Sequence, residues 1–292
     1  MPKLETLYII GNGFDLHHSL PTSYAEFHEF VLSNNIALDN TLDEYFTMKI
    51  NSNSLWTNFE EDLGSFDWEL FYSSNNNINI NSDNFRPSDA FGLEDELTAE
   101  AEDIKNVIRD TFEDWIDSID ISQAQRKLDF VESARFISFN YTMVLEEIYN
   151  IPPKGILHIH GDALGHSGKL QFGHNKTMDE DPELDEDGDS NRTMFSDSES
   201  AAKIPFYTFH KPVDEIIAAN IAAFEAIKGI KDIYVLGHSL NQIDIPYFKE
   251  IYNRSKYAKW NVSFYLDKEK ETHMHTLHQI GIPAESINLY QL

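Results

Sequence analysis

Residues that could do chemistry follow four short apolar runs of this 292-residue chain, at the point where each run ends. They are Gly11 and Gly13 after LYII, Asn140 after ISF, His160 after LHI, and Gly237, His238 and Ser239 after YVL. If the runs are parallel strands, their carboxyl ends converge on one crevice of the sheet. Glycines, an amide, an imidazole and a hydroxyl at such a place predict a ligand-binding or catalytic site.

The opening turn, LYIIGNGFDL, is the first of these ends. Two glycines after a strand let the backbone approach a pyrophosphate, and the next helix start offers free N–H groups. The third glycine of the dinucleotide fingerprint is absent, since Leu16 or His17 stands in its place, so a simple tight turn also fits. Asp15 could steady a positive charge, although its position favours a helix N-cap.

The elements that must position these residues follow from the hydrophobic pattern. Residues 5–10 have the composition of a buried strand, whereas 22–131 show helical spacing, interrupted by the Asn-rich stretch 73–81. After residue 133, apolar strand patterns, among them 169–175, alternate with helical ones. This predicts an α/β fold: a Rossmann-like, doubly wound parallel sheet formed by 1–21 and 132–292, with 22–131 as a large helical insertion.

Helical spacing of aromatic residues also predicts the core of the insertion. The side chains expected to be buried are Tyr24, Phe27, Phe30, Trp56, Phe59, Trp68 and Trp115.

Composition excludes several classes of function. The chain has no cysteine, so thiolate nucleophiles and thiolate metal sites are ruled out. Its net charge is −28, with ten acidic residues and one arginine in 178–199, which disfavours nucleic acid and anionic membranes as partners. The sequence shows neither a secretory signal nor a membrane-spanning run, so we expect a cytoplasmic protein.

Five stretches together resemble the bacteriophage abortive-infection AbiH family: LYIIGNGFDLHHSLPTSY, WTNFEEDL, ISFNYTMVLE, HIHGD and LGHSLNQID. That family in turn resembles sirtuin-like NAD-consuming domains. The resemblance implies an anti-phage effector that hydrolyses the nicotinamide–ribose bond of NAD or a related nucleotide, with NAD as substrate and no required cofactor or metal. It implies Asn140 and His160 as catalytic residues. It implies nucleotide contacts from Gly11, Asn12, Gly13, Phe14, Asp15, Gly161, Gly237, His238, Ser239 and Asp244.

Two departures from the sirtuin-like pattern bear on activity. Thr142 stands where the Asn turn of NAD hydrolases has an acid, and the four cysteines of the deacetylase zinc module are missing. Deacetylation is therefore disfavoured, while NAD hydrolysis or non-catalytic nucleotide binding remains. Hydrolysis passes through a sugar cation, so His160 would polarise a ribose hydroxyl or water and Asn140 would fix a water or the carboxamide.

Other functions stay open at this point. A nucleotide-sensing or partner-binding module of a defence system is the main alternative, and a homo-oligomer or a defence-system partner is expected to control either activity. His158, His160 and Asp162 have the spacing of a metal loop, as in a phosphoesterase or nuclease. Ser239 sits in a sequence similar to a nucleophile elbow, for which Asp267 and one of His273, His275 or His278 could complete a serine hydrolase triad.

Overall fold

The computed structural model describes residues 5–166, 168–179, 182, 184 and 186–292. Contacts between residues divide the chain into two units. Unit 1 comprises 1–23, 115–171 and 212–292, and unit 2 comprises 24–114 and 172–211. Each is described by itself.

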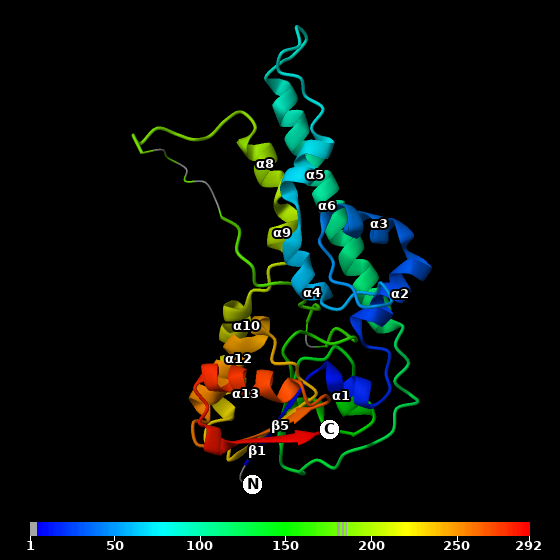
Figure 1. The fold of residues 1–292 in the computed structure, drawn as a ribbon, viewed down its shortest axis with the longest axis vertical. Coiled ribbons are helices and arrows are strands. Elements are labelled where there is room, and N and C mark those ends of the chain that lie inside the picture. Colours follow the sequence, from blue (N-terminus) through cyan, green and yellow to red (C-terminus); the bar gives the residue numbers. More distant parts are fainter. Residues whose placement is uncertain (1–4, 167, 180–181, 183, 185) are drawn as a thin grey trace. The chain divides into compact units, whose positions relative to one another are not determined.

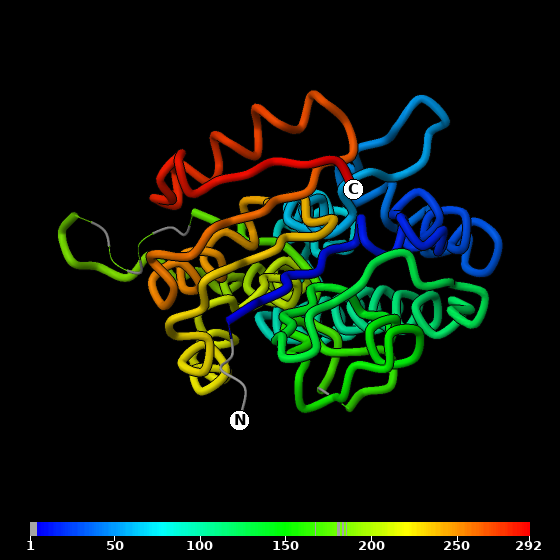
Figure 2. The backbone as a smooth tube through the Cα atoms, turned by 90° about the horizontal axis from the view of Figure 1, so that it is seen from below, coloured from blue at the N-terminus to red at the C-terminus, as the bar shows by residue number. Residues whose placement is uncertain are grey.

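Unit 1 is built around a six-stranded sheet with the order β3-β2-β1-β4-β5-β6. The strands are β1 (Thr6–Ile10), β2 (Arg135–Ser138), β3 (Ile156–His158), β4 (Asp232–Leu236), β5 (Lys259–Phe264) and β6 (Ile287–Gln291). All neighbouring pairs are parallel. In Figure 2, β1 (blue) lies inside the sheet and β6 (red) at one edge. The predicted parallel α/β fold is confirmed, in the strand order typical of dinucleotide-binding folds.

Helices cover both faces of this sheet. They are α1 (Asn12–His17), α7 (Val144–Glu147), α10 (Val213–Ala219), α11 (Ile221–Ala226), α12 (Ile245–Arg254) and α13 (Glu269–Ile280), with short 3₁₀ turns at Pro153–Gly155, Gln242–Asp244 and Ala284–Ser286. On one face, Leu7 and Ile9 of β1 pack in a core with α10 to α13, which Figure 1 shows beside β5. On the other face, Tyr8 and Ile10 pack with α1 and α7. Alternation along β1 therefore supplies both cores.

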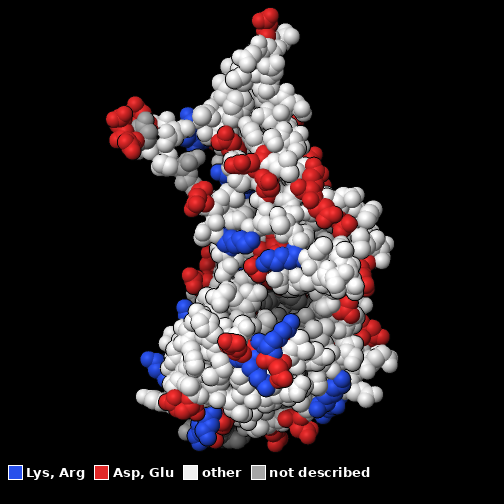
Figure 3. All heavy atoms as spheres, in the orientation of Figure 1, with Lys and Arg blue, Asp and Glu red and all other residues white. Residues whose placement is uncertain are grey.

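Unit 2 is helical. Its helices are α2 (Tyr24–Asn34), α3 (Ile36–Tyr45), α4 (Phe59–Asp62), a 3₁₀ turn at Leu63–Ser65, α5 (Trp68–Asn75), α6 (Ser88–Asp117), whose last residues belong to unit 1, α8 (Ser196–Ala202) and α9 (Ile204–Thr208). Its aromatic core brings Phe27, Phe59 and Phe112 together with Phe172 from the later segment. Acidic side chains gather on the loop before α8 (Figure 3).

Several expectations require correction. Residues 46–58 and 118–131 are not helical, because the chain is irregular between α3 and α4 and again after α6 ends at Asp117. Residues 169–175 form no strand; there His174 makes an isolated bridge to His210 instead. Of the aromatic residues expected in the core, Phe27, Trp56, Phe59 and Trp115 are buried, whereas Tyr24, Phe30 and Trp68 are only half-buried.

The predicted Asn-rich interruption at 73–81 is irregular from residue 76 onward, while residues 73–75 complete α5. Asn76 and Asn79 accept hydrogen bonds from backbone N–H groups two residues further on, so their side chains shape local turns. Among the described residues, no helix combines the length and apolarity needed to cross a bilayer.

Candidate functional site

The strand ends selected from the sequence adjoin one another in unit 1. Strands β3, β2, β1 and β4 are consecutive in the sheet and parallel, so their carboxyl ends lie at one edge. Neighbouring segments of the chain remain hydrogen-bonded just past the ends of these strands. Phe139 N donates to Ile10 O at 2.9 Å, and Ile159 N donates to Ser138 O at 2.9 Å. The sheet thus brings the residues that follow each strand to the same edge.

The glycines of the opening turn pack against the turn after β4. Gly11 N donates to Leu236 O at 2.9 Å, and Gly13 N donates to Gly237 O at 2.7 Å. A Cβ on Gly11 would lie 2.6 Å from His238 Cα, and one on Gly13 would lie 2.8 Å from Gly237 Cα. Gly237 also has a φ of +65°. Close backbone packing between two turns therefore requires these glycines, and both N–H groups are already used.

Two neighbours of the glycines anchor the turn. Asn12 donates from its side-chain Nδ2 to Thr22 O at 2.7 Å. Phe14 has no exposed surface, and its ring packs against Tyr149. The contacts of Asn12 and Phe14 within unit 1 therefore hold the turn in place.

Asp15 lies in the first turn of α1, but it does not cap the helix. The N-cap position is Gly11, so the predicted capping role of Asp15 is wrong. Instead Thr142 Oγ1 donates to Asp15 Oδ2 at 2.6 Å. Burial raises the pKa of Asp15 to about 6, although the bonded Thr142 hydroxyl and the nearby Asn140 amide work against the rise. Unit 1 therefore holds a buried carboxyl group that titrates near neutral pH.

Asn140 follows β2 with 5% of its surface exposed. Its backbone N–H donates to Ser138 Oγ at 3.2 Å. Neither side-chain Oδ1 nor Nδ2 makes a hydrogen bond of good geometry with the described part of the chain, although the amide lies near enough to Asp15 to lower its pKa. Such atoms are rare inside proteins and commonly bind water or ligand. The amide is suited to hold a substrate group.

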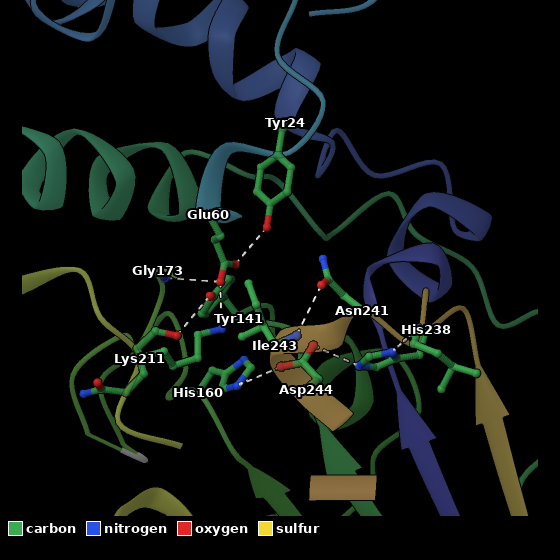
Figure 4. A network of polar contacts seen from close by, with 12 residues as sticks. Tyr24, Glu60, Tyr141, His160, Gly173, Lys211, His238, Asn241, Ile243 and Asp244 are labelled. Atoms are coloured by element: carbon green, nitrogen blue, oxygen red, sulfur yellow. Dashed lines mark hydrogen bonds and ion pairs between the residues drawn. The ribbon is translucent and has the colours of Figure 1, made fainter. Parts of the chain in front are cut away.

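Asp244 belongs to the 3₁₀ turn before α12 and lies between His160 and His238 (Figure 4). Asp244 Oδ1 is 3.7 Å from His160 Nε2, and Asp244 Oδ2 is 3.4 Å from His238 Nε2. Leu240 N donates to His238 Nδ1 at 2.9 Å, so in neutral His238 the proton is on Nε2, towards the carboxylate. The Phe139 ring packs edge-on against both imidazoles.

This arrangement places a carboxylate oxygen of Asp244 beside the buried His160 ring. An imidazole so placed can take a proton from water or a sugar hydroxyl, and the carboxylate stabilises the cation that results. Asp244, expected as a nucleotide contact, therefore also lies where it can assist His160.

The two remaining predicted contacts lie on loops of the same unit. Gly161 has a φ of +82°, and a Cβ there would lie 2.7 Å from Lys169 O, so glycine is needed for the loop to return. Gln171 N donates to His160 O at 2.8 Å and closes that loop. Ser239 is exposed after β4.

The alternative metal loop is occupied by other contacts. Asp162 Oδ1 accepts from the backbone N–H groups of Leu164 and His166, and His158 binds Glu146. Within the described ranges, no group of three or more His, Asp and Glu side chains is arranged to hold a metal ion.

Two residues of the predicted serine hydrolase triad, Asp267 and His275, contact neighbours on their own part of the chain. Asp267 pairs with Lys270, with 88% of its side chain exposed. His275 contacts Gln279 on the exposed side of α13. Both residues therefore have partners other than Ser239.

Sequence reasoning missed two polar contacts at this edge. The sequence assigns no contact to either residue: Thr142 stands there as the replacement of an acid, and Glu146 is the last residue of the stretch ISFNYTMVLE. Both contacts join residues far apart in the chain: Thr142 binds Asp15, and Glu146 binds His158. The only available signal was the position of Thr142 two residues after Asn140.

The comparison with protein families identifies a family for most of the chain. The model described as "Bacteriophage abortive infection AbiH" matches residues 7–265, which include every residue of the edge described above. No curated protein and no solved structure gives a significant match to the chain. The chain therefore belongs to the AbiH family, and its role is in abortive infection, a defence against bacteriophage.

Proposed function

We propose that unit 1 hydrolyses the nicotinamide–ribose bond of NAD or a related nucleotide during abortive infection. The observation that carries the proposal is the cluster at the carboxyl edge: Asn140 with an unsatisfied amide, Asp15 beside it, and His160 facing Asp244. The edge belongs to a sheet with the strand order of dinucleotide-binding folds, in which ligands bind outside the carboxyl ends. The resemblance of the motifs to sirtuin-like NAD-consuming domains adds support.

The side chains suit a reaction that passes through a sugar cation. His160 would polarise a ribose hydroxyl or remove a proton from the attacking water, with Asp244 stabilising the protonated imidazole. Asn140 would hold the water or the carboxamide of the leaving group. Asp15, when ionised, would stabilise positive charge on the ribose.

The glycine turn would contribute shape more than hydrogen bonds. The N–H groups of Gly11 and Gly13 are bonded to the turn after β4, so phosphate recognition would come from other groups. For this reason a substitution at Gly11 would act by separating the two turns, since its Cβ would collide with His238.

Nicotinamide release from NAD by the purified chain tests the proposal. We expect turnover by the wild type, and His160→Ala should lower it by about 10²- to 10⁴-fold, as is usual for loss of a general base. His275→Ala removes an exposed histidine of the same unit and is the matched control. Circular dichroism should show equal folding of all three proteins.

The same variants in phage-challenged cells separate hydrolysis from sensing. NAD should fall in cells with the wild type or His275→Ala, and both the fall and the protection should disappear with His160→Ala. Protection that persists in His160→Ala, or undiminished NAD in protected wild-type cells, would overturn the hydrolase assignment. In that case NAD binding without turnover, measured by calorimetry, would identify a nucleotide-sensing module.

A further inference from the structure

His158, at the end of β3, is buried with 6% of its surface exposed, and both of its ring nitrogens lie within hydrogen-bond distance of oxygen. Nδ1 lies 3.2 Å from Asn140 O, and Nε2 lies 2.9 Å from Glu146 Oε1. Both partners come from the segment that follows β2.

The chemistry of these partners fixes the charge of the ring. A backbone carbonyl only accepts hydrogen bonds, and so does an ionised carboxylate, so each ring nitrogen must carry a hydrogen. An imidazole with hydrogens on both nitrogens is a cation. Burial opposes protonation of His158, but the hydrogen bond and charge of Glu146 outweigh it and raise the pKa of His158 above its ordinary value.

A second buried histidine of unit 1 provides the contrast. His18 Nδ1 contacts Phe14 O at 2.7 Å, and its Nε2 contacts the Tyr149 hydroxyl at 2.7 Å. Because a hydroxyl can donate, His18 satisfies both contacts while neutral. Burial lowers the pKa of His18. The two sites differ mainly in having a carboxylate or a phenol as the second partner.

The contacts of His158 hold the backbone of Asn140. Ser138 Oγ accepts from Asn140 N, and His158 Nδ1 donates to Asn140 O, so both backbone polar groups of this residue are bonded. The side-chain amide is thereby presented from a fixed backbone. A charged donor gives a stronger hydrogen bond than a neutral one.

We propose that His158 is a buried imidazolium, maintained by Glu146, that positions Asn140 for substrate. The positioning of substrate rests on the proposed function, whereas the charge of His158 does not. It is a positioning residue, because it acts through the backbone of Asn140. The other charged groups that face it are Asp162 after β3 and Asp15 on α1.

Nitrogen-15 NMR of the imidazole rings in the full chain tests the charge directly. At pH 7 His158 should show hydrogens on both ring nitrogens, while His18 should show one. Signals are assigned with His158→Gln and His18→Gln. A His158 ring with a single hydrogen at pH 7 would overturn the proposal.

Glu146→Gln tests the coupling to Asn140. Its amide oxygen can still accept from Nε2 while the charge is removed, so His158 should titrate at lower pH than in the wild type. The side-chain amide signals of Asn140 should follow that titration. In NAD hydrolysis, kcat on the alkaline side should fall about 10- to 100-fold with little change in KM, and lower pH should restore it.

The two proposals fail in different ways. A chain that does not hydrolyse NAD still answers the question about His158, because the ring and Asn140 signals need no substrate. Asn140 signals that stay unchanged while His158 titrates would overturn the positioning role, even in an active enzyme. Glu147→Gln, in the adjacent position of α7, is the charge-matched control.

Discussion

Replacement of Asp15 by asparagine should stabilise unit 1 increasingly as pH rises. Asp15 is 1% exposed, and its pKa is raised from 3.8 to about 6, mainly by burial. The native state therefore binds a proton more tightly than the unfolded chain does. For a carboxyl group with a raised pKa, stability is lost as pH rises from the unfolded to the folded value, and the loss then remains constant.

The magnitude follows from the two pKa values. Each pKa unit corresponds to about 1.4 kcal/mol, so ionised Asp15 lowers the unfolding free energy by about 3 kcal/mol at pH 8. At pH 5 the native carboxyl is mostly protonated, and the same relation gives a loss of unfolding free energy of about 1.6 kcal/mol. Asparagine cannot ionise but places an amide beside Thr142, which adds a contribution that does not vary with pH. The stability difference between variant and wild type should therefore change by about 1.4 kcal/mol between pH 5 and pH 8.

Native-state hydrogen exchange of the buried β1 amides measures this quantity for unit 1 alone. Exchange free energies of wild type and Asp15→Asn are compared at pH 5 and pH 8, after correction for intrinsic exchange. Asp267→Asn removes an exposed negative charge from the same unit and controls for net charge. An equal difference at both pH values, or a variant that loses stability relative to wild type as pH rises, would show that the ionised carboxylate is not penalised and would refute the reasoning.

Two other substitutions test packing and charge. Gly237→Ala should destabilise unit 1 by more than about 3 kcal/mol in urea unfolding, because its Cβ would lie 2.1 Å from Phe14 N. Gly229→Ala is the control: its φ is +78° and no atom lies within 4 Å of the added Cβ, so the substitution should cost only about 1–2 kcal/mol. Lys211→Met should destabilise unit 2 by about 3–5 kcal/mol, because it removes the buried ammonium group that lies 2.7 Å from the Glu60 carboxylate. The double variant Lys211→Met/Glu60→Gln should recover most of this loss, and equal stability of the single and double variants would contradict the reasoning.

The sheet was predictable because its strands carry local signals. The clearest of them, β1 and β4, are short apolar runs that end at a glycine, and the strand patterns after residue 133 alternate with helical ones. The stretch 169–175 has the same apolar appearance, yet it forms no strand. Phe172 there packs against Phe112 in unit 2, so this apolar side chain is buried in a helical core. Local pattern predicts burial and leaves the partner undetermined.

The candidate site was predictable to the level of strand ends. Parallel strands place the residues after them at one edge, so Asn140 and His160 could be grouped from topology alone. The contact of Thr142 with Asp15 could not, since it joins residues 127 positions apart. The glycine pair shows the same limit: the spacing indicates close backbone approach, but only the structure shows that the approaching backbone is that of Gly237.

The carboxyl edge of the sheet differs from other buried polar contacts because its polar groups reduce the stability of the fold. Lys211 and Glu60 are buried as an ion pair that neutralises both charges (Figure 4), whereas ionised Asp15 costs stability and the unsatisfied Asn140 amide costs about 1–3 kcal/mol. A core that served stability alone would gain from apolar side chains at these positions. Groups retained at such a cost are typical of sites that bind or react. We therefore expect Asp15→Asn to gain stability at pH 8 and to lose NAD hydrolysis in the same protein, because the same ionised carboxylate would cause both effects. A variant that is more stable and fully active would assign Asp15 no part in the reaction.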